Sequence, residues 1–161
     1  MPRVYTQVFG VVGAIIEQGG RFLLVKENQL GHPDNGKWNQ PAGWIDVGEN
    51  PLDAAKREVK EETGYDFTPT NLLSVSSIVR RDQTAHLGTT PHALKLIFVG
   101  TISEKVGKLE DDVSETRWFT PEEIEAMDTK TLRDIDIKGL VRNYLLGRHY
   151  PLDILHHTVA Q

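Results

Sequence analysis

The sequence predicts a single α+β domain, and three observations support this. The chain has 161 residues, of which 39% are hydrophobic and 25% charged, as expected for one globular domain. Apolar runs bounded by turn residues predict strands on both sides of a strongly marked helix over residues 51–63. No repeat, low-complexity segment or linker interrupts the chain. We therefore expect one domain over residues 1–161.

The segment before this helix predicts a hairpin, a loop and a short strand. The apolar runs VFGVVGAII and RFLLV flank a Gly-Gly turn, which is typical of two paired strands. The polar stretch NQLGHPDNGK is rich in turn-forming residues and predicts a loop. WNQPAGW then predicts a short strand that ends in a turn.

The helix itself carries start and stop signals at both ends. Asn50 suits the N-cap, Pro51 the first helical position, and Asp53 the positive end of the helix dipole. Gly64 suits the position after the last turn. We therefore expect a helix over residues 51–63.

The segment after the helix predicts more strands and two further helices. NLLSVSSIVR, HALKLIFVGTI and TRWF predict strands, separated by the loops RDQTAHLGTTP and KVGKLEDDVSE. Thr120, Pro121 and Glu123 predict a helix start with a capping box. A last amphipathic helix is expected to end near Gly147. Its predicted buried face consists of Ile137, Leu140, Val141, Tyr144 and Leu145.

Charge and composition exclude several classes of function. The net charge of −5 argues against broad electrostatic binding to nucleic acid. The absence of cysteine excludes disulfides, thiolate chemistry and zinc sites that use cysteine. No apolar run approaches ~18 residues, and the first residues lack the layout of a signal peptide. We therefore expect a cytoplasmic protein without membrane contact.

The predicted helix 51–63 concentrates three carboxylates on one side. Glu58 and Glu62 are one turn apart and Glu61 lies beside them, whereas Lys56 and Lys60 point away. A solvated charged face is one explanation, but such faces usually mix both signs. The alternative is a site for a hard cation such as Mg²⁺ or Mn²⁺, which carboxylate oxygens bind well.

The spacing around these glutamates resembles a known motif. The Nudix box has the pattern G-x5-E-x7-R-E-U-x-E-E-x-G-U, where U is a bulky aliphatic residue. This chain is similar to it: Gly43 is followed after five residues by Glu49, and Glu49 is followed after seven residues by REVKEETGY. The one departure is Tyr65, where the family usually has an aliphatic residue, and we expect it to affect packing rather than chemistry. The late run RWFTPEEI is also similar to members of this family.

This resemblance implies a fold and a reaction. The Nudix fold is an α/β/α sandwich with a mixed central β-sheet and the Nudix loop-helix-loop. Nudix enzymes hydrolyse a pyrophosphate bond in a nucleoside diphosphate that is linked to another group, with the help of divalent ions. Homodimers are frequent among them. We therefore expect a Nudix pyrophosphohydrolase with a small-molecule nucleotide or diphosphate substrate.

The resemblance also implies roles for residues of the box. Glu58, Glu61 and Glu62 are expected to bind Mg²⁺ or Mn²⁺, with the Gly43 carbonyl as a further ligand. The catalytic base is expected to be Glu58 or, failing that, Glu61. Since a carboxylate beside a metal serves as either ligand or base, the sequence leaves these two roles open.

Other residues are candidates for supporting roles. Glu49 and Arg57 are similar to the structural ion pair of the family. An acid outside the box often completes the metal site, and one loop offers several, each of which is equally well explained as a solvated loop acid. These acids are Glu110, Asp111, Asp112 and Glu115.

The substrate is less well marked. The run NQPAG, where most members have a leucine before the proline, and the late RHYPLDIL are similar to the NudJ group of phosphatases within the family. Gln40 is then a candidate to face the substrate, or a strand residue satisfied by backbone. Arg80 and Arg81 are candidates to meet phosphate, or ordinary surface charges.

Two other functions compete with hydrolysis. The first is a Nudix-fold sensor that binds a nucleotide and regulates a partner, although such regulators often have a degraded box and an added DNA-binding domain. The second is an RNA-end pyrophosphohydrolase, against which the acidic balance counts.

Overall fold

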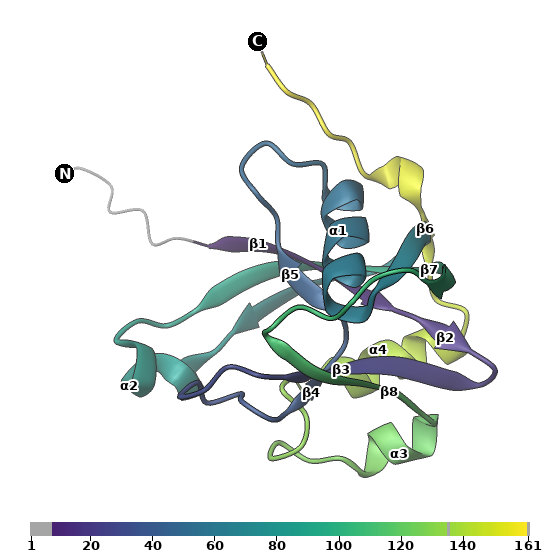
Figure 1. Cartoon of the computed structure of the whole chain (residues 1–161). Coiled ribbons are helices and arrows are strands. Elements are labelled where there is room, and N and C mark those ends of the chain that lie inside the picture. Colours follow the sequence, from purple (N-terminus) through teal and green to yellow (C-terminus); the bar gives the residue numbers. More distant parts are fainter. Residues whose placement is uncertain (1–7, 135, 161) are drawn as a thin grey trace.

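Two β-sheets form the centre of the molecule in a computed structural model, which describes residues 8–134 and 136–160 (Figure 1). The first sheet is mixed, because β1 and β7 run parallel while all its other pairs are antiparallel. Its strands, in spatial order, are β5 (Ala42–Trp44), β1 (Phe9–Ile15), β7 (His92–Lys105), β6 (Tyr65–Val79) and β9 (Tyr150–Pro151). The predicted mixed sheet is therefore confirmed.

The second sheet is antiparallel, and the sequence does not predict it as a separate unit. Its central strand, β3, pairs with the other three strands. The strands are β2 (Glu17–Gln18), β3 (Arg21–Glu27), β4 (Trp38–Asn39) and β8 (Val113–Phe119). In the chain, β4 of this second sheet is followed closely by β5 of the first sheet, so residues 38–44 connect the two sheets.

Helix α1 (Pro51–Thr63) has the predicted bounds and both predicted end signals. The Asn50 side chain accepts a hydrogen bond from the Leu52 N–H at 2.9 Å, and Gly64 adopts a left-handed conformation with φ of 76°. Its small buried residues, Ala54 and Ala55, let the helix lie close to the first sheet. Glu58 and Glu62 are thereby held beside β5, against Gly43 and the Ala42 N–H.

Helix α4 (Asp136–Leu145) packs on the face of the first sheet opposite to α1, and the short α3 (Pro121–Ala126) precedes it in the chain (Figure 1). The predicted capping box at the start of α3 is present. Most of the predicted buried face of α4 packs into the core, but Leu145 is 57% exposed. Leu145 lies about 40° further round the helix than Val141, at the edge of the stripe that meets the sheet. Helices on both faces confirm the predicted α/β/α arrangement.

Several elements differ from the sequence predictions. β6 begins at Tyr65, directly after α1, because it pairs with β7 over nearly its whole length. The segment predicted as a loop between β6 and β7 contains two short helices, η1 (Arg81–Gln83) and α2 (Thr84–Leu87). After α4, β9 and η2 (Leu152–Ile154) cover the edge of β6.

Tyr65 packs against the core cluster under α1, in agreement with the packing role expected for this position. Within residues 8–134 and 136–160, no helix has both the length and the apolar composition needed to cross a membrane.

Candidate active site

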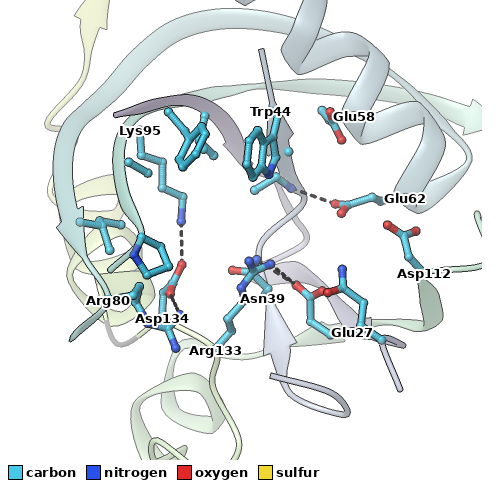
Figure 2. A pocket seen from close by; sticks show the side chains of 18 of the residues that line it. Glu27, Asn39, Trp44, Glu58, Glu62, Arg80, Lys95, Asp112, Arg133 and Asp134 are labelled. Carbon is cyan, nitrogen blue, oxygen red and sulfur yellow. Dashed lines mark hydrogen bonds and ion pairs between the residues drawn. The ribbon is translucent and has the colours of Figure 1, made fainter. Parts of the chain in front are cut away.

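A cavity of about 400 Å³ opens between the two sheets and the side of α1 (Figure 2). Its volume is in the range of small-molecule sites. One end is acidic and is lined by Gly43, Glu58, Glu61, Glu62, Glu110 and Asp112. The rest of the lining carries aromatic, amide and paired charged groups, among them Phe9, Asn39, Trp44, Arg80, Lys95, Arg133 and Asp134.

The glutamates of α1 line the acidic end at different depths. Glu58 lies so close to Gly43 that a Cβ on Gly43 would be 2.0 Å from the Glu58 carboxylate carbon. Glu62 is buried and accepts a hydrogen bond from the Ala42 N–H at 2.8 Å. Burial, and to a lesser degree neighbouring carboxylates, raise the pKa of Glu58 and that of Glu62 above their ordinary values. These two carboxyl groups at the acidic end of the cavity therefore accept a proton more readily than an ordinary glutamate does.

Arg57, on α1, links the glutamates at the acidic end of the cavity with the loop before the helix. Its Nε and Nη2 donate to the two oxygens of Glu49, both at 2.9 Å, and Nη2 also donates to the Trp44 carbonyl at 2.9 Å. Its Nη1 donates to Glu58 at 2.6 Å and to Glu61 at 3.1 Å. The hydrogen bond with Glu49, followed by those with the other glutamates, raises the pKa of Arg57, and the Arg57 hydrogen bond lowers the pKa of Glu49. The predicted Glu49–Arg57 pair is thus present in the structure.

The predicted metal ligands share the cavity but are not assembled around one point. Among the residues that the structure describes, no three acidic or histidine side chains converge closely enough to hold one ion. Arg57 draws Glu58 and Glu61 to itself, and the backbone of Ala42 holds Glu62. The donor set nevertheless fits a hard divalent cation, because it consists of carboxylate oxygens on one side of one helix.

The four loop acids divide into two pairs. Glu110 and Asp112 line the cavity next to α1, where the Glu110 N–H donates to the Glu61 carbonyl at 3.1 Å. Burial and the charges of Glu61 and Asp112 raise the pKa of Glu110. Asp111 and Glu115 do not line it, and Glu115 lies 3.8 Å from the Lys26 ammonium. Glu110 and Asp112 are therefore the loop acids placed to assist the glutamates.

A network of paired charges forms the far end of the cavity. Asp34, which is 1% exposed, accepts hydrogen bonds from Arg80 at 3.1 Å and from Gln83 at 2.6 Å. Burial by itself raises the pKa of Asp34, but the hydrogen bonds and charge of Arg80 outweigh it and hold the pKa below its ordinary value. Asp134 accepts from Arg80 at 3.0 Å and from the buried Lys95 at 3.2 Å. This end of the cavity is therefore built from fixed side chains.

The three predicted substrate residues have different places. Arg80 lines the cavity, but its guanidinium is held by aspartates, which raise its pKa despite partial burial. Arg81 is exposed on η1 and does not line the cavity. Gln40 is fully buried behind the lining, and within the described part of the chain neither polar atom of its side chain has a hydrogen-bond partner.

The family can be assigned from the match of the chain to a model of the NUDIX domain, which covers residues 6–138. The chain belongs to the NUDIX family. It is 29% identical over 148 residues to "Phosphatase NudJ" from Escherichia coli strain K12, with 89% of this chain and 88% of that protein covered. These matches confirm the predicted family and the likeness to the NudJ group.

Two solved structures of Nudix hydrolases are similar to this chain. A NUDIX hydrolase from Nitrosomonas europaea is 33% identical with a TM-score of 0.79, covering 94% of this chain and 98% of that one. A MutT NUDIX hydrolase from Burkholderia pseudomallei is 27% identical with a TM-score of 0.62, covering 73% and 86%. With the NudJ match, they support the predicted enzyme class, a Nudix pyrophosphohydrolase.

Sequence reasoning missed several cavity residues that lie outside the Nudix box. Asn39, Lys95 and Asp134 come from β4, from β7 and from the segment before α4, and Asp34 supports them from the loop after β3. No local pattern marks them, because their partners lie far away in the sequence. From the sequence, Asp34 is expected in a loop and Asn39 in a short strand, and neither is predicted to have a functional role.

Replacing Arg57 with alanine is expected to lower kcat/KM about 10-fold and to weaken metal binding. The change removes a side chain that links Glu49 with Glu58 and Glu61, so the glutamates lose this common anchor. Metal titration and steady-state kinetics measure both effects. Lys56→Ala is the matched control, because Lys56 is on the same helix and pairs with the exposed Asp53, away from the cavity. Unchanged kinetics and metal affinity in Arg57→Ala would show that the pair has no part in activity.

Replacing Asp34 with asparagine is expected to raise KM about 10-fold with little change in kcat, and to lower the free energy of unfolding by about 3 kcal/mol. The change leaves Arg80 and Arg133 short of a buried counter-charge, although no ion pair among the described residues joins either arginine to the glutamates of α1. Chemical denaturation and kinetics test this. Asp66→Asn is the control, since Asp66 forms an exposed pair with Lys60 and does not line the cavity. A fall in kcat at unchanged KM would contradict this role.

Proposed function

We propose that the chain hydrolyses a pyrophosphate bond in a nucleoside diphosphate or triphosphate, or in a similar small organic diphosphate, with Mg²⁺ or Mn²⁺. One observation carries the proposal: the glutamates of the Nudix box line one end of a cavity with room for a small ligand. An acidic wall repels phosphate, and a divalent cation reverses that repulsion. Membership of a family of nucleotide hydrolases supports the same reaction class.

The residues expected to hold the metal are Glu58, Glu61 and Glu62, with the Gly43 carbonyl as a further ligand and with Glu110 or Asp112 assisting. When bound, the ion neutralises phosphate oxygens and lowers the pKa of a bound water. We assign the base to Glu58 first and Glu61 second. Glu58 is largely buried and burial raises its pKa, which makes its carboxylate a better proton acceptor.

A substrate panel tests this function. Purified protein is incubated with nucleoside triphosphates, nucleoside diphosphates, ADP-ribose, dinucleoside polyphosphates, thiamine-related diphosphates and capped RNA, with Mg²⁺, Mn²⁺ or EDTA. We expect metal-dependent release of a monophosphate or phosphate from at least one small diphosphate. Hydrolysis of capped RNA alone would support the RNA-end function instead. Tight nucleotide binding without any hydrolysis would support the sensor.

Two other expectations from the sequence stay predictions. Light scattering coupled to size-exclusion chromatography tests the expected homodimer. Cell fractionation tests the expected cytoplasmic location.

A further inference from the structure

The loop between β7 and β8, residues 106–112, brings Glu110 and Asp112 to the acidic end of the cavity. Its first part is tied to α1 and to the residue that follows this helix. Two N–H groups at the start of the loop donate to the Gly64 carbonyl at 2.8 and 3.0 Å, and the Glu110 N–H donates to the Glu61 carbonyl at 3.1 Å. These bonds use backbone atoms, and they fix the loop as far as Glu110.

The last part of the loop is a β-turn. The Val113 N–H donates to the Glu110 carbonyl at 3.2 Å, so Asp111 and Asp112 are the two central residues of this turn. The hydrogen bond that closes a β-turn uses the carbonyl of its first residue, and the carbonyls of the two central residues need partners from elsewhere.

Asn28 supplies partners to both central carbonyls. It follows β3 directly and is exposed. Its backbone N–H donates to the Asp112 carbonyl at 2.7 Å, and its side-chain Nδ2 donates to the Asp111 carbonyl, also at 2.7 Å. A single residue from a distant part of the chain therefore holds the turn that carries Asp112.

The side-chain bond of Asn28 fixes the peptide group between Asp111 and Asp112. Turning this peptide over converts a type I turn into a type II turn and points the Asp111 carbonyl to the opposite side. The type II turn requires a positive φ at the second central residue, here Asp112, and aspartate tolerates positive φ better than most residues do. Among the residues that the structure describes, only glycines have a positive φ. The peptide is therefore not turned over, and Asn28 binds it in this orientation.

The orientation of this peptide decides where the Asp112 carboxylate lies. In the observed turn the Asp112 side chain lies at the acidic end of the cavity, as does that of Glu62 (Figure 2). A change of φ at Asp112 from negative to positive rotates its side chain relative to the rest of the turn and removes the carboxylate from this place. Asn28 does not line the cavity itself. Its effect on the cavity therefore passes through Asp112.

We propose that Asn28 is a positioning residue for the acidic end of the cavity. Its side-chain amide holds the Asp111–Asp112 peptide and so keeps the Asp112 carboxylate where it assists the glutamates of α1 in binding a divalent cation. The inference rests on the proposed function, since it concerns the metal of that reaction. It requires that Asn28 alter metal affinity through Asp112.

The test measures the Kd for Mn²⁺ by electron paramagnetic resonance, without substrate, so that no hydrolysis is needed. In Asn28→Ala we expect a Kd about 5-fold higher than in the wild-type protein, the size that loss of one hydrogen bond gives. Thermal unfolding should be nearly unchanged, because Asn28 is exposed. Asn71→Ala is the matched control and should keep the wild-type Kd, since the Asn71 Nδ2 donates to the Tyr150 carbonyl at 3.4 Å and Asn71 does not line the cavity. A wild-type Kd in Asn28→Ala would overturn the proposal.

A double-mutant cycle separates positioning from general support of the loop. Asp112→Asn alone is expected to raise the Kd for Mn²⁺ about 10-fold. Adding Asn28→Ala to Asp112→Asn should raise it no further, because the carboxylate that Asn28 positions is already gone. A further rise of about 5-fold in the double variant would show that Asn28 acts by another route and would contradict the proposal. A wild-type Kd in Asp112→Asn would contradict it as well.

The outcomes also separate this inference from the proposed function. Metal-dependent hydrolysis of the substrate panel, together with equal Mn²⁺ affinities in the wild-type protein and Asn28→Ala, would refute the role of Asn28 and leave the hydrolase standing. The predicted pattern of Mn²⁺ affinities without hydrolysis of any substrate would support the role of Asn28 and count against the hydrolase.

Discussion

Glu58→Gln and Glu61→Gln are each expected to lower kcat about 1,000-fold while the protein stays folded. Glutamine keeps the size and removes the charge, so an ion loses a ligand or the water loses its base. These changes touch the acidic end of the cavity, and neither side chain packs in the core. Circular dichroism and thermal unfolding check the fold, and the most active substrate of the panel reports kcat.

Metal titration of the same variants separates the two roles. If Glu58 is the base, Glu58→Gln loses activity but keeps most of its metal affinity, whereas a ligand variant loses both. Asp53→Asn serves as the control, since this exposed carboxylate is on the first turn of the same helix and outside the cavity. Activity within about 10-fold of wild type in both glutamine variants would exclude α1 as the catalytic element.

Gly43→Ala is expected to lower kcat/KM about 100-fold, although it adds only one methyl group. The added carbon would lie 2.0 Å from the Glu58 carboxylate carbon, a distance at which the side chain must move away. Displacement of Glu58 misplaces both a predicted ligand and the predicted base, and small misplacements of this kind are costly in catalysis. The fold should survive, because the obstacle is a side-chain end and not backbone.

The control for this variant is Gly139→Ala on α4. A Cβ at Gly139 meets nothing within 4 Å, and alanine favours helix over glycine by about 1 kcal/mol. We therefore expect unchanged kinetics and slightly higher stability in Gly139→Ala. Wild-type kinetics in Gly43→Ala would show that Glu58 does not act from the place it has in the structure.

The sequence predicts α1 well because the signals that define it are local. The Asn50 cap, Pro51 and Gly64 act within one turn of the helix ends, and the structure shows the expected bounds. The same locality placed Glu58, Glu61 and Glu62 on one side of the helix. In contrast, the start of β6 depends on pairing with β7, and η1 is joined to the distant Asp34 through Gln83, so the sequence did not predict either.

The residues of the candidate site also divide into those that the local sequence predicts and those that only the tertiary structure brings together. The sequence by itself determined the family, the acidic helix and the Glu49–Arg57 pair, because the Nudix box joins these residues within one short segment. Only the tertiary structure decided the far end of the cavity, where Asn39, Lys95 and Asp134 come from three separate segments. Those side chains meet through sheet pairing and buried charge networks, and such contacts join residues that have no spacing in common along the chain.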